Sequence, residues 1–311
     1  MPSKIEWTDE TWNPVTGCTK VSQGCKHCYA EGVARRFWGD RKFTDVQTHP
    51  DRLDQPLRWR KPRRVFVNSM SDLFHDDVPD KFIDQVFAIM ALAKEHTFQV
   101  LTKRPARMLA YLRQVQDVEK DMNRWACAAP ETYPCAAFAI EDCDWPLPNV
   151  WLGVSVEDQA TADERIPLLL QMPAALRFVS YEPALGPVNL WPWLNDPETY
   201  SAGGGFIAGD GDWKGPSPIG WIIVGGESGP KARPFDVAWA AQTVGQCKDA
   251  GVPCFVKQLG AQPITNNDHP ISGGMDWELG RIPLKHPKGA DPSEWPADLR
   301  VQQYPETEKS P

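Results

Sequence analysis

The chain has 311 residues, of which 41% are hydrophobic and 8 are cysteine. That apolar fraction is enough for a hydrophobic core, which excludes a disordered or fibrous chain. The 33 basic and 41 acidic residues give a net charge of −8, which argues against broad, non-specific affinity for nucleic acid. Because we find neither an apolar run of membrane-spanning length nor a signal-peptide pattern, we expect a cytoplasmic protein without membrane contact. Its cysteines are then not a disulfide framework.

One segment departs from the acidic average. Arg58–Arg64 holds five basic residues in seven. We interpret it as a solvated approach to a strand, and a basic groove for nucleic acid is the alternative.

Short apolar runs, each followed by polar or Gly/Pro residues, predict six strands buried under helices. They lie at residues 65–69, 98–103, 150–155, 176–180, 221–226 and 252–257. Apolar residues at helical spacing lie between them. They predict helices that begin at Pro79, near Met108, at a capping box of Thr161 with Glu164, and at Val237 with Gly251 as the stop.

The alternation of strand and helix predicts an α/β fold with a parallel sheet. We expect a full or partial (β/α) TIM-type barrel with loop insertions, and an open doubly wound sheet is the alternative. The barrel-like domain is predicted over residues 1–282, with a cysteine loop at 17–29 and insertions near 121–149 and 191–220. Residues 283–311 lack any period and predict an irregular C-terminal tail.

The strongest chemical signal is the spacing C-x6-C-x2-C of Cys18, Cys25 and Cys28. Gly17 and Gly24 allow tight turns, so the loop can aim three thiolates at one point. Soft thiolates suit zinc or an iron–sulfur cluster. A closed zinc site needs four ligands, and the side chain of His27 points elsewhere if Cys25 and Cys28 converge. Three cysteines therefore favour a [4Fe–4S] cluster with one open iron, whereas zinc and three metal-free thiols are the alternatives.

The remaining cysteines carry less information. Cys247 and Cys254 fall on a helix stripe and in a strand, so we interpret them as core residues. Cys127, Cys135 and Cys143 are evenly spaced in the first insertion. Such wide spacing is not diagnostic of a second metal site.

The cysteine loop resembles the cluster loop of the radical S-adenosylmethionine (SAM) superfamily, which usually has C-x3-C-x2-C with an aromatic residue before the last cysteine. His27 takes that aromatic position, and the first gap is six residues instead of three. The whole chain resembles an uncharacterised, phage- and prophage-associated family of three-Cys-motif, radical-SAM-like proteins. The segments that carry this resemblance are Glu6–Cys18, Asn68–Phe74, Leu101–Pro105, Gly153–Glu157, Ser180–Pro183, Gly225–Gly229, Lys257–Gln258 and Glu294–Arg300.

The resemblance implies a barrel of the radical SAM kind and favours an enzyme. It also implies that Cys18, Cys25 and Cys28 are metal ligands and hold a [4Fe–4S] cluster that cleaves S-adenosylmethionine. An electron donor is then a partner, and a nucleic acid base is one candidate substrate. The substrate, the product and the oligomeric state do not follow from it. The competing hypothesis is a non-enzymatic zinc or iron–sulfur binding module that acts with a partner protein.

Polar residues follow the predicted strands, at the end of a parallel barrel where active sites gather. Given the resemblance, we expect those after the early strands to bind SAM together with His27. Asn68, Ser69 or Asp72 corresponds to the ligands of the amino group. Lys103 or Arg104 could hold the carboxylate, and Ser155 or Glu157 the ribose. Gly225 and Gly226 lie near the adenine, or else form a packing turn.

The later strands end in candidates for chemistry on the substrate. Tyr181, Glu227 and Lys257 are expected to contact it, or to handle protons and radicals. The structural alternative is that Lys103 and Lys257 form salt bridges with Glu157, Glu182 or Glu227.

Overall fold

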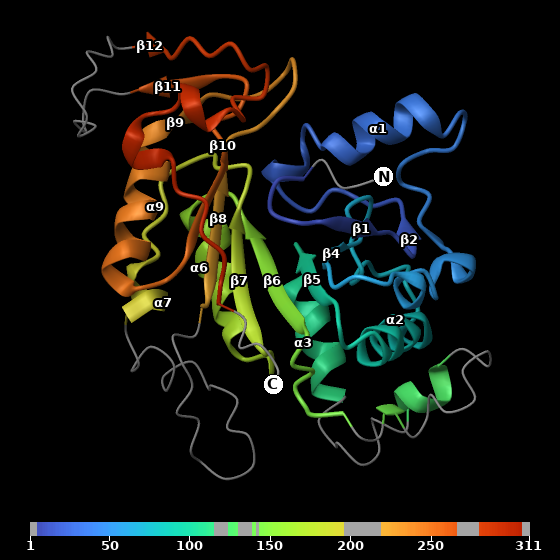
Figure 1. Cartoon of the computed structure of the whole chain (residues 1–311). Coiled ribbons are helices and arrows are strands. Elements are labelled where there is room, and N and C mark those ends of the chain that lie inside the picture. The colour runs from blue at the N-terminus through green and yellow to red at the C-terminus, as the bar shows by residue number, and fades with distance from the viewer. Residues whose placement is uncertain are drawn as a thin grey trace. The chain divides into compact units, whose positions relative to one another are not determined.

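Seven parallel strands follow the order β1-β4-β5-β6-β7-β8-β10 in the computed structural model (Figure 1). The structure describes residues 5–114, 124–129, 139–140, 143–195, 219–265 and 280–306. The strands are β1 Glu10–Trp12, β4 Arg64–Val67, β5 Thr97–Thr102, β6 Val150–Val156, β7 Leu176–Tyr181, β8 Trp221–Gly225 and β10 Cys254–Gln258. All six predicted strands are confirmed, and β1 is a seventh that we did not predict. This linear order fits a partial (β/α) barrel or an open parallel sheet.

The chain divides into two compact units. The N-terminal unit consists of Met1–Val21, Ala30–Val154 and Gln171–Leu176. The C-terminal unit consists of Ser22–Tyr29, Ser155–Leu170 and Arg177–Pro311. The cysteine loop is thus shared, because Cys18 belongs to the first unit and the other two cysteines to the second.

In the N-terminal unit, β4 pairs in parallel with both β1 and β5, and β5 pairs with β6. The helices are α1 Tyr29–Phe37, α2 Asp80–Leu92 and α3 Pro105–Gln114, and the short elements are β2 Val15–Thr16, β3 Gln47–Thr48, η2 Pro50–Arg52 and η3 Pro56–Arg58. The helix predicted to begin at Pro79 is confirmed, with Pro79 as its N-cap. Its apolar stripe, which includes Ile83 and Phe87, is buried in the core.

A buried polar network joins α2 and α3 to the described part of the first predicted insertion. Asp84 accepts hydrogen bonds from the Tyr111 hydroxyl at 2.9 Å and from Arg124 Nε at 2.7 Å. Trp125 Nε1 donates to the same hydroxyl at 3.1 Å, and its ring stacks on Phe87 with centroids 5.1 Å apart. Because each polar group has a partner, the network can lie in the core at little cost. Residues 115–123, 130–138 and 141–142 lie outside the described residues.

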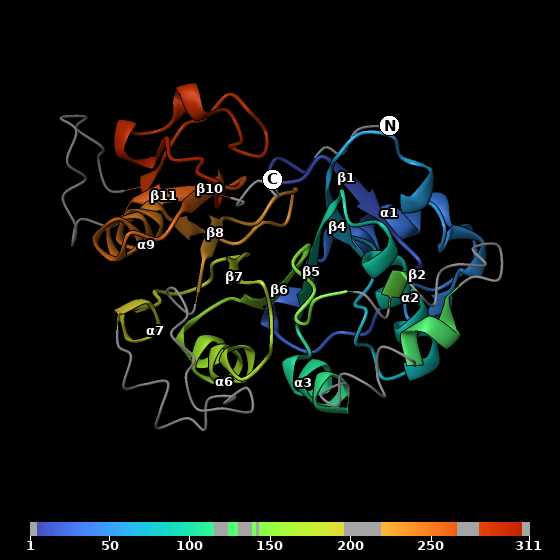
Figure 2. The same cartoon turned by 60° about the horizontal axis from the view of Figure 1, so that its bottom comes forward.

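In the C-terminal unit, β8 pairs in parallel with β7 and β10. Its helices are α6 Gln159–Leu170, α7 Trp191–Asn195 and α9 Val237–Ala250. Figure 2 shows α9 running beside β8 and β10. Asp236 caps α9 by accepting from Ala238 N, and Gly251 ends it in the left-handed conformation with φ 68°. The predicted helix and its glycine stop are confirmed.

The start of α6 differs from the prediction. Asp158, and not Thr161, is the residue that caps the helix, since its Oδ1 accepts from Thr161 N at 2.9 Å. The Thr161 hydroxyl instead accepts from the backbone N–H groups of Glu157 and Asp158. A carboxylate is as good a cap as a hydroxyl, so the helix is capped three residues earlier than the sequence pattern indicated.

A second, smaller sheet of the same unit consists of β9 Phe235–Asp236, which precedes α9, and of β11 Pro263–Thr265 and β12 Gly280–Arg281, which follow β10. The segment predicted as an irregular tail holds η4 Pro292–Glu294 and η5 Ala297–Leu299, with Trp295 fully buried. It then runs antiparallel to β10, where Val256 N donates to Val301 O at 2.8 Å. Of the second predicted insertion, residues 196–218 lie outside the described part. Among the described helices, none combines the length and the hydrophobicity needed to cross a membrane.

The packing of Gly226 after β8 gives a test of this fold. A Cβ atom there would lie 2.7 Å from Leu259 O and 2.9 Å from Phe235 Cβ. Gly226→Ala should therefore lower the free energy of unfolding by about 1–3 kcal/mol, measured by urea denaturation. The matched control is Gly245→Ala in α9, where a Cβ meets nothing within 4 Å and should raise stability by roughly 0.5–1 kcal/mol. Equal stability of Gly226→Ala and the wild type would contradict this packing.

Candidate functional site

The cysteine loop begins with a glycine that the backbone requires. Gly17 has φ +95°, and a Cβ on it would lie 2.4 Å from Asp45 O. Its N–H donates to Met70 O at 3.1 Å, and the next N–H, that of Cys18, donates to Phe43 O at 2.8 Å. Gly17 forms a parallel β-bridge with Ser71, so the glycine is needed for its positive φ and for close packing and not for the predicted tight turn. The bridge and these bonds fix the backbone of Cys18.

Asp72 organises the strand end that faces Cys18 within the N-terminal unit. Its buried carboxylate accepts from Thr102 Oγ1 at 2.7 Å, from Lys103 N at 3.0 Å and from Arg104 Nη1 at 3.3 Å. These bonds fix the loop after β5 and place a guanidinium beside the carboxylate. Asp72 thus positions Arg104.

Arg104 in turn holds the first half of the cysteine loop. Its Nη2 donates to Thr19 O at 3.1 Å and to Thr19 Oγ1 at 2.9 Å, and its Nη1 lies 3.5 Å from Cys18 Sγ. His75 Nε2 lies 2.7 Å from the same threonine hydroxyl. Burial alone would lower the pKa of Arg104, but Asp72 and Cys18 raise it above its ordinary value. The guanidinium is therefore a permanent cation beside the Cys18 sulfur.

The second half of the loop, in the C-terminal unit, lies against Glu157. Ser22 Oγ donates to Glu157 Oε1 at 2.9 Å. A Cβ on Gly24 would lie 2.4 Å from the same oxygen. Gly24 is therefore required, as predicted, but for close approach of a carboxylate and not for a left-handed turn. Both contacts lie next to Cys25 in η1 Gln23–Cys25.

Glu157 is itself held by Arg165 of α6. The glutamate side chain is fully buried, and Arg165 Nη1 lies 3.3 and 3.2 Å from its two oxygens. The same Nη1 donates to Ser155 O at 2.6 Å. A buried carboxylate is tolerated only when it is paired in this way, so Arg165 is as necessary to the site as Glu157.

A further pair, Glu227 with Arg233, reaches the loop from the segment after β8. Arg233 Nη2 and Nε donate to the two oxygens of Glu227 at 2.8 and 3.0 Å, and Arg233 Nη1 donates to Gln23 O at 3.0 Å. Burial would raise the pKa of Glu227, but the hydrogen bonds from Arg233 lower it below its ordinary value, with a smaller contribution from His27. Glu227 is therefore ionised at neutral pH and anchors the arginine that holds the loop.

Asn68 is a predicted site residue whose side-chain Nδ2 lacks a hydrogen-bond partner among the described residues. It has φ 61°, a conformation that asparagine tolerates better than most residues. The side chain is 2% exposed, and its Oδ1 accepts from Val15 N at 3.2 Å. Its Nδ2 has no hydrogen-bond partner among the described residues. The neighbouring Ser69 Oγ donates to Asn13 Oδ1 at 3.2 Å.

Glu182 contacts two of the predicted site residues, Lys257 and Ser155. Lys257 Nζ forms a salt bridge with Glu182 Oε1 at 2.6 Å, which confirms the structural alternative for Lys257. Ser155 Oγ donates to Glu182 O at 3.1 Å. Tyr181 is fully buried, and its hydroxyl donates to Gly186 O. Burial, followed by nearby Asp158, raises the pKa of Tyr181 well above its ordinary value, so the phenol stays protonated.

Gly225 ends β8 and Gly226 follows it, and both are closely packed. Gly226 leaves no room for a Cβ, and the backbone around it is held by Gln258 Nε2, which donates to Gly226 O at 2.8 Å. A Cβ on Gly225 would lie 3.3 Å from Gln258 O. Of the two readings of this turn, the structure supports close packing of the strands.

The structure divides the predicted residues between the units. Those after β4 and β5 share the N-terminal unit with Cys18, and those after the later strands share the C-terminal unit with His27, Cys25 and Cys28. All three loop cysteines are partly exposed. Within the described ranges, no three His, Cys, Asp or Glu side chains form a group that could hold a metal ion.

Five residues that hold the loop were not predicted from the sequence, and these are Thr19, Ser22, His75, Arg165 and Arg233. Arg165 had one usable signal, since it stands on the apolar stripe of α6 and an arginine there needs a buried acid. Of the remaining cysteines, the two that were predicted to lie in the core do so. Cys247 and Cys254 are buried, Cys127 is exposed, and Cys135 lies outside the described residues.

The lowered pKa of Glu227 predicts a pH dependence of stability. The ordinary value is 4.5, so the ionised carboxylate stabilises the fold above that pH, and this contribution is lost as the pH falls through the lowered value. Glu227→Gln should lower the free energy of unfolding at pH 7 by roughly 1–3 kcal/mol. The difference from the wild type should shrink below pH 4.5 in urea denaturation.

The control for this pair of measurements is Glu164→Gln, since Glu164 is exposed on α6. It should match the wild type at both ends of the pH range. A Glu227→Gln deficit that stays constant from pH 7 to pH 3.5 would show that the ion pair does not stabilise the fold.

Comparison with known proteins gives a family and no closer relative. No curated protein and no solved structure matches the chain. One family model matches residues 2–282, which covers most of the chain and ends where the predicted barrel-like domain ends. The chain therefore belongs to the family described as "Protein of unknown function (DUF5131)".

Proposed function

We propose that this chain is a radical SAM-type enzyme that holds a [4Fe–4S] cluster on Cys18, Cys25 and Cys28. The observation that supports it most is the anchoring of the cysteine loop. Arg104 holds its first half, and the pairs Glu157–Arg165 and Glu227–Arg233 hold its second half. A loop needs such fixed backbone when its side chains must meet one rigid ligand.

The donor set fits this group. Three partly exposed thiols offer soft ligands to iron and leave one iron without a protein ligand. The Arg104 cation beside Cys18 Sγ favours an anionic, thiolate-ligated cluster. When bound, the cluster supplies the electron that cleaves S-adenosylmethionine and starts radical chemistry.

Several chain residues are then available to S-adenosylmethionine. The buried Nδ2 of Asn68 is a donor without a partner among the described residues, so it suits an acceptor such as the carboxylate of the ligand. Lys103, which follows the strand end fixed by Asp72, adds a cation there. Glu157 and Glu227 are positioning residues in this proposal. Glu157 accepts from Ser22 of the loop, and Glu227 binds Arg233, which donates to Gln23 O of the loop.

The substrate side follows from the same proposal. Glu182 and Lys257 form an ion pair that a bound substrate could open, and a nucleic acid base is the proposed substrate class. The proposal includes a cytoplasmic location and a separate electron donor.

Anaerobic purification and reconstitution test the proposal. The wild type should bind about four iron and four sulfide per chain, and Cys18→Ala, Cys25→Ala and Cys28→Ala should each lose most of that iron. Cys127→Ala is the matched control, because Cys127 is exposed and lies in another segment. It should retain the full iron content.

The competing zinc or iron–sulfur binding module gives different results. Stoichiometric zinc with no iron after anaerobic purification would contradict the proposal. So would a cluster that is retained equally in Cys18→Ala and the wild type.

A further inference from the structure

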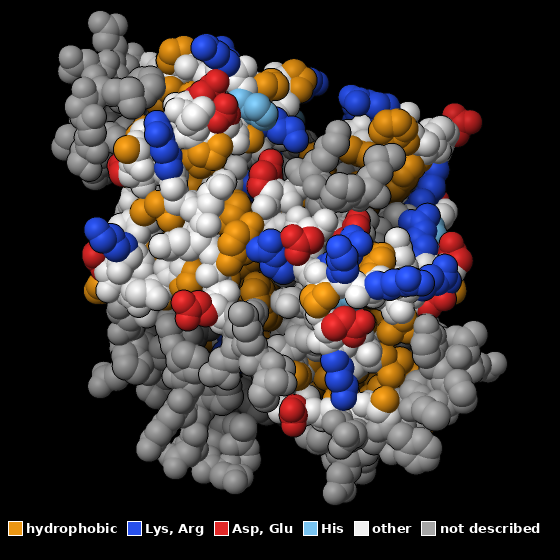
Figure 3. Space-filling model, in the orientation of Figure 1, with side chains coloured by type: hydrophobic (Ala, Val, Ile, Leu, Met, Phe, Trp, Pro, Cys, Tyr) orange, Lys and Arg blue, Asp and Glu red, His pale blue; other side chains and the backbone are white. Residues whose placement is uncertain are grey.

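Several arginines on the surface of the N-terminal unit are paired with acidic residues. In the basic run, Arg63 pairs with Glu10 and Arg64 pairs with Asp9, which confirms part of its interpretation as a solvated approach to a strand. Figure 3 shows Lys and Arg side chains on the face around β2 with Asp and Glu among them. The interpretation of this run as a groove for nucleic acid gains no support from these two arginines.

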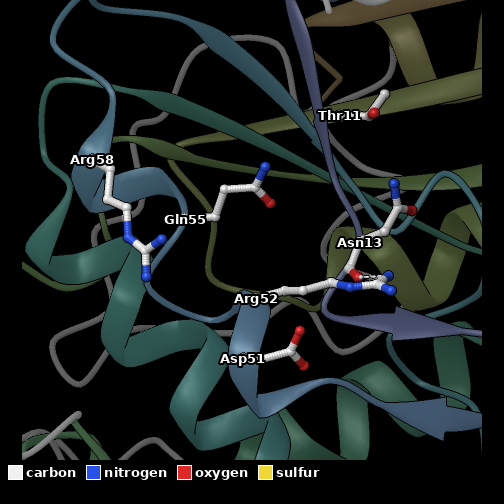
Figure 4. Close-up of a pocket in the computed structure, with 6 residues that line it drawn as sticks. All are labelled: Thr11, Asn13, Asp51, Arg52, Gln55 and Arg58. Atoms are coloured by element: carbon white, nitrogen blue, oxygen red, sulfur yellow. Dashed lines mark hydrogen bonds between the residues drawn. The ribbon is translucent and has the colours of Figure 1, made fainter.

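A polar pocket in the same unit is lined by Arg52 and Arg58 but does not join them (Figure 4). The Arg52 guanidinium is turned toward Asn13 and away from Arg58, and its Nη1 donates to Asn13 O at 3.4 Å. Arg58 pairs with Asp54 instead. Each arginine has its own partner, and a donor that is still unused lies elsewhere in the unit, next to Cys18.

That donor is the hydroxyl of Thr19, which lies between two nitrogen groups. Its Oγ1 is 2.9 Å from Arg104 Nη2 and 2.7 Å from His75 Nε2. A hydroxyl has two lone pairs that accept hydrogen bonds and one proton that it donates. The direction of the two contacts therefore decides whether the proton is still available.

The hydrogen bond between His75 and Thr19 runs from the imidazole to the hydroxyl. His75 Nδ1 accepts from the backbone N–H of Asp77 at 3.1 Å. Because a backbone N–H can only donate, Nδ1 carries no proton, and the neutral ring has its proton on Nε2. Burial and the Arg104 cation lower the pKa of His75 below its ordinary value, which favours the neutral ring. Nε2 is therefore a donor to Thr19 Oγ1.

The contact with Arg104 fills the second lone pair of Thr19. A guanidinium has donors and no acceptor, so Arg104 Nη2 also donates to Oγ1. Both lone pairs are then occupied, and the hydroxyl proton has no acceptor among the described residues. A half-buried donor that is fixed in this way suits an anion that forms beside it.

Cys18 becomes such an anion when it ligates a metal. The Arg104 fork holds both residues, since Nη1 lies 3.5 Å from Cys18 Sγ while Nη2 binds Thr19 Oγ1. In the thiol form, Cys18 Sγ donates to Thr19 O at 3.4 Å. A metal ligand is a thiolate, which has lost that proton and accepts hydrogen bonds instead. The sulfur then has two donors beside it, Arg104 and the Thr19 hydroxyl.

We infer that the Thr19 hydroxyl donates a hydrogen bond to the sulfur of Cys18 when this cysteine ligates a metal. The inference rests on the part of the proposed function that makes Cys18 a metal ligand, and it holds for iron and for zinc. Thr19 and His75 are then positioning residues, because His75 directs the Thr19 proton and the proton stabilises negative charge on the sulfur. Hydrogen bonds to the sulfurs of a cluster set its reduction potential.

Cobalt(II) is a probe of the Cys18 thiolate that requires no cluster. The full chain is titrated with cobalt(II) without oxygen, and the sulfur-to-cobalt charge-transfer band is recorded. A hydrogen bond withdraws electron density from the sulfur, so Thr19→Val and Thr19→Ala should move this band to longer wavelength. Thr19→Ser keeps the hydroxyl and should restore the wild-type position.

Thr8→Val is the matched control in the same unit. The Thr8 hydroxyl already donates to a backbone oxygen, that of Arg64, at 2.9 Å. Removing it deletes a threonine hydroxyl without changing the donors beside Cys18. This variant should therefore have the wild-type band.

The midpoint potential of the reconstituted cluster is the second measurement. At the potential that reduces half of the wild type, the ratio of reduced to oxidised cluster in Thr19→Val should be about tenfold lower, which is about 59 mV for one electron. Thr19→Ser and Thr8→Val should stay close to the wild type. Since Thr19 is half-buried, Thr19→Ala should fold even if Thr19→Val does not, and it should show the same change.

Failure of this inference differs from failure of the proposed function. If metal binds but the band and the potential of Thr19→Val and Thr19→Ala equal those of the wild type, the inference alone is overturned. Equal shifts in Thr19→Ser and Thr19→Val would also overturn it. A cobalt band that depends on Thr19 in a protein that assembles no iron–sulfur cluster would support the inference and contradict the proposed function. A protein that binds neither metal would overturn both.

Discussion

Pairing between arginines and acidic side chains is the interaction on which the cysteine loop depends. Asp72–Arg104, Glu157–Arg165 and Glu227–Arg233 each place a guanidinium or a carboxylate against the loop. Removing one partner of such a pair costs more than the pair contributes, because the other charge is left buried. The same interactions therefore stabilise the fold and fix the backbone that carries the thiols.

The fold was predictable where one local rule decided it. The six apolar runs each predicted a strand that the structure contains. Gly251 was predicted to end α9, and it does so in the left-handed conformation that glycine adopts most readily. β1 was missed because its three residues are too short for periodicity to identify. The start of α6 was misplaced because two residues, Asp158 and Thr161, could each cap a helix, and the choice depends on tertiary contacts.

The site was predictable in its members and less so in their roles. The rule that polar residues gather after parallel strands identified Asp72, Glu157 and Glu227 as candidates. The sequence alone does not show that each of these carboxylates forms an ion pair with an arginine. Arg104 lies in the Leu101–Pro105 segment and was itself a candidate, whereas Arg165 lies on a helix and Arg233 in a loop, where no motif singled them out. Tyr181 looked reactive in the sequence, yet its hydroxyl donates to Gly186 O, a local contact that follows from the turn after β7.

The central claim is that the anchored loop binds a cluster with an iron open to S-adenosylmethionine. The most direct measurement is the electron paramagnetic resonance spectrum of the reduced, anaerobically reconstituted protein, recorded with and without S-adenosylmethionine. The account predicts a [4Fe–4S]⁺ signal whose g values shift when S-adenosylmethionine is added. A spectrum that is identical with and without it, or the absence of any iron–sulfur signal, would contradict the account.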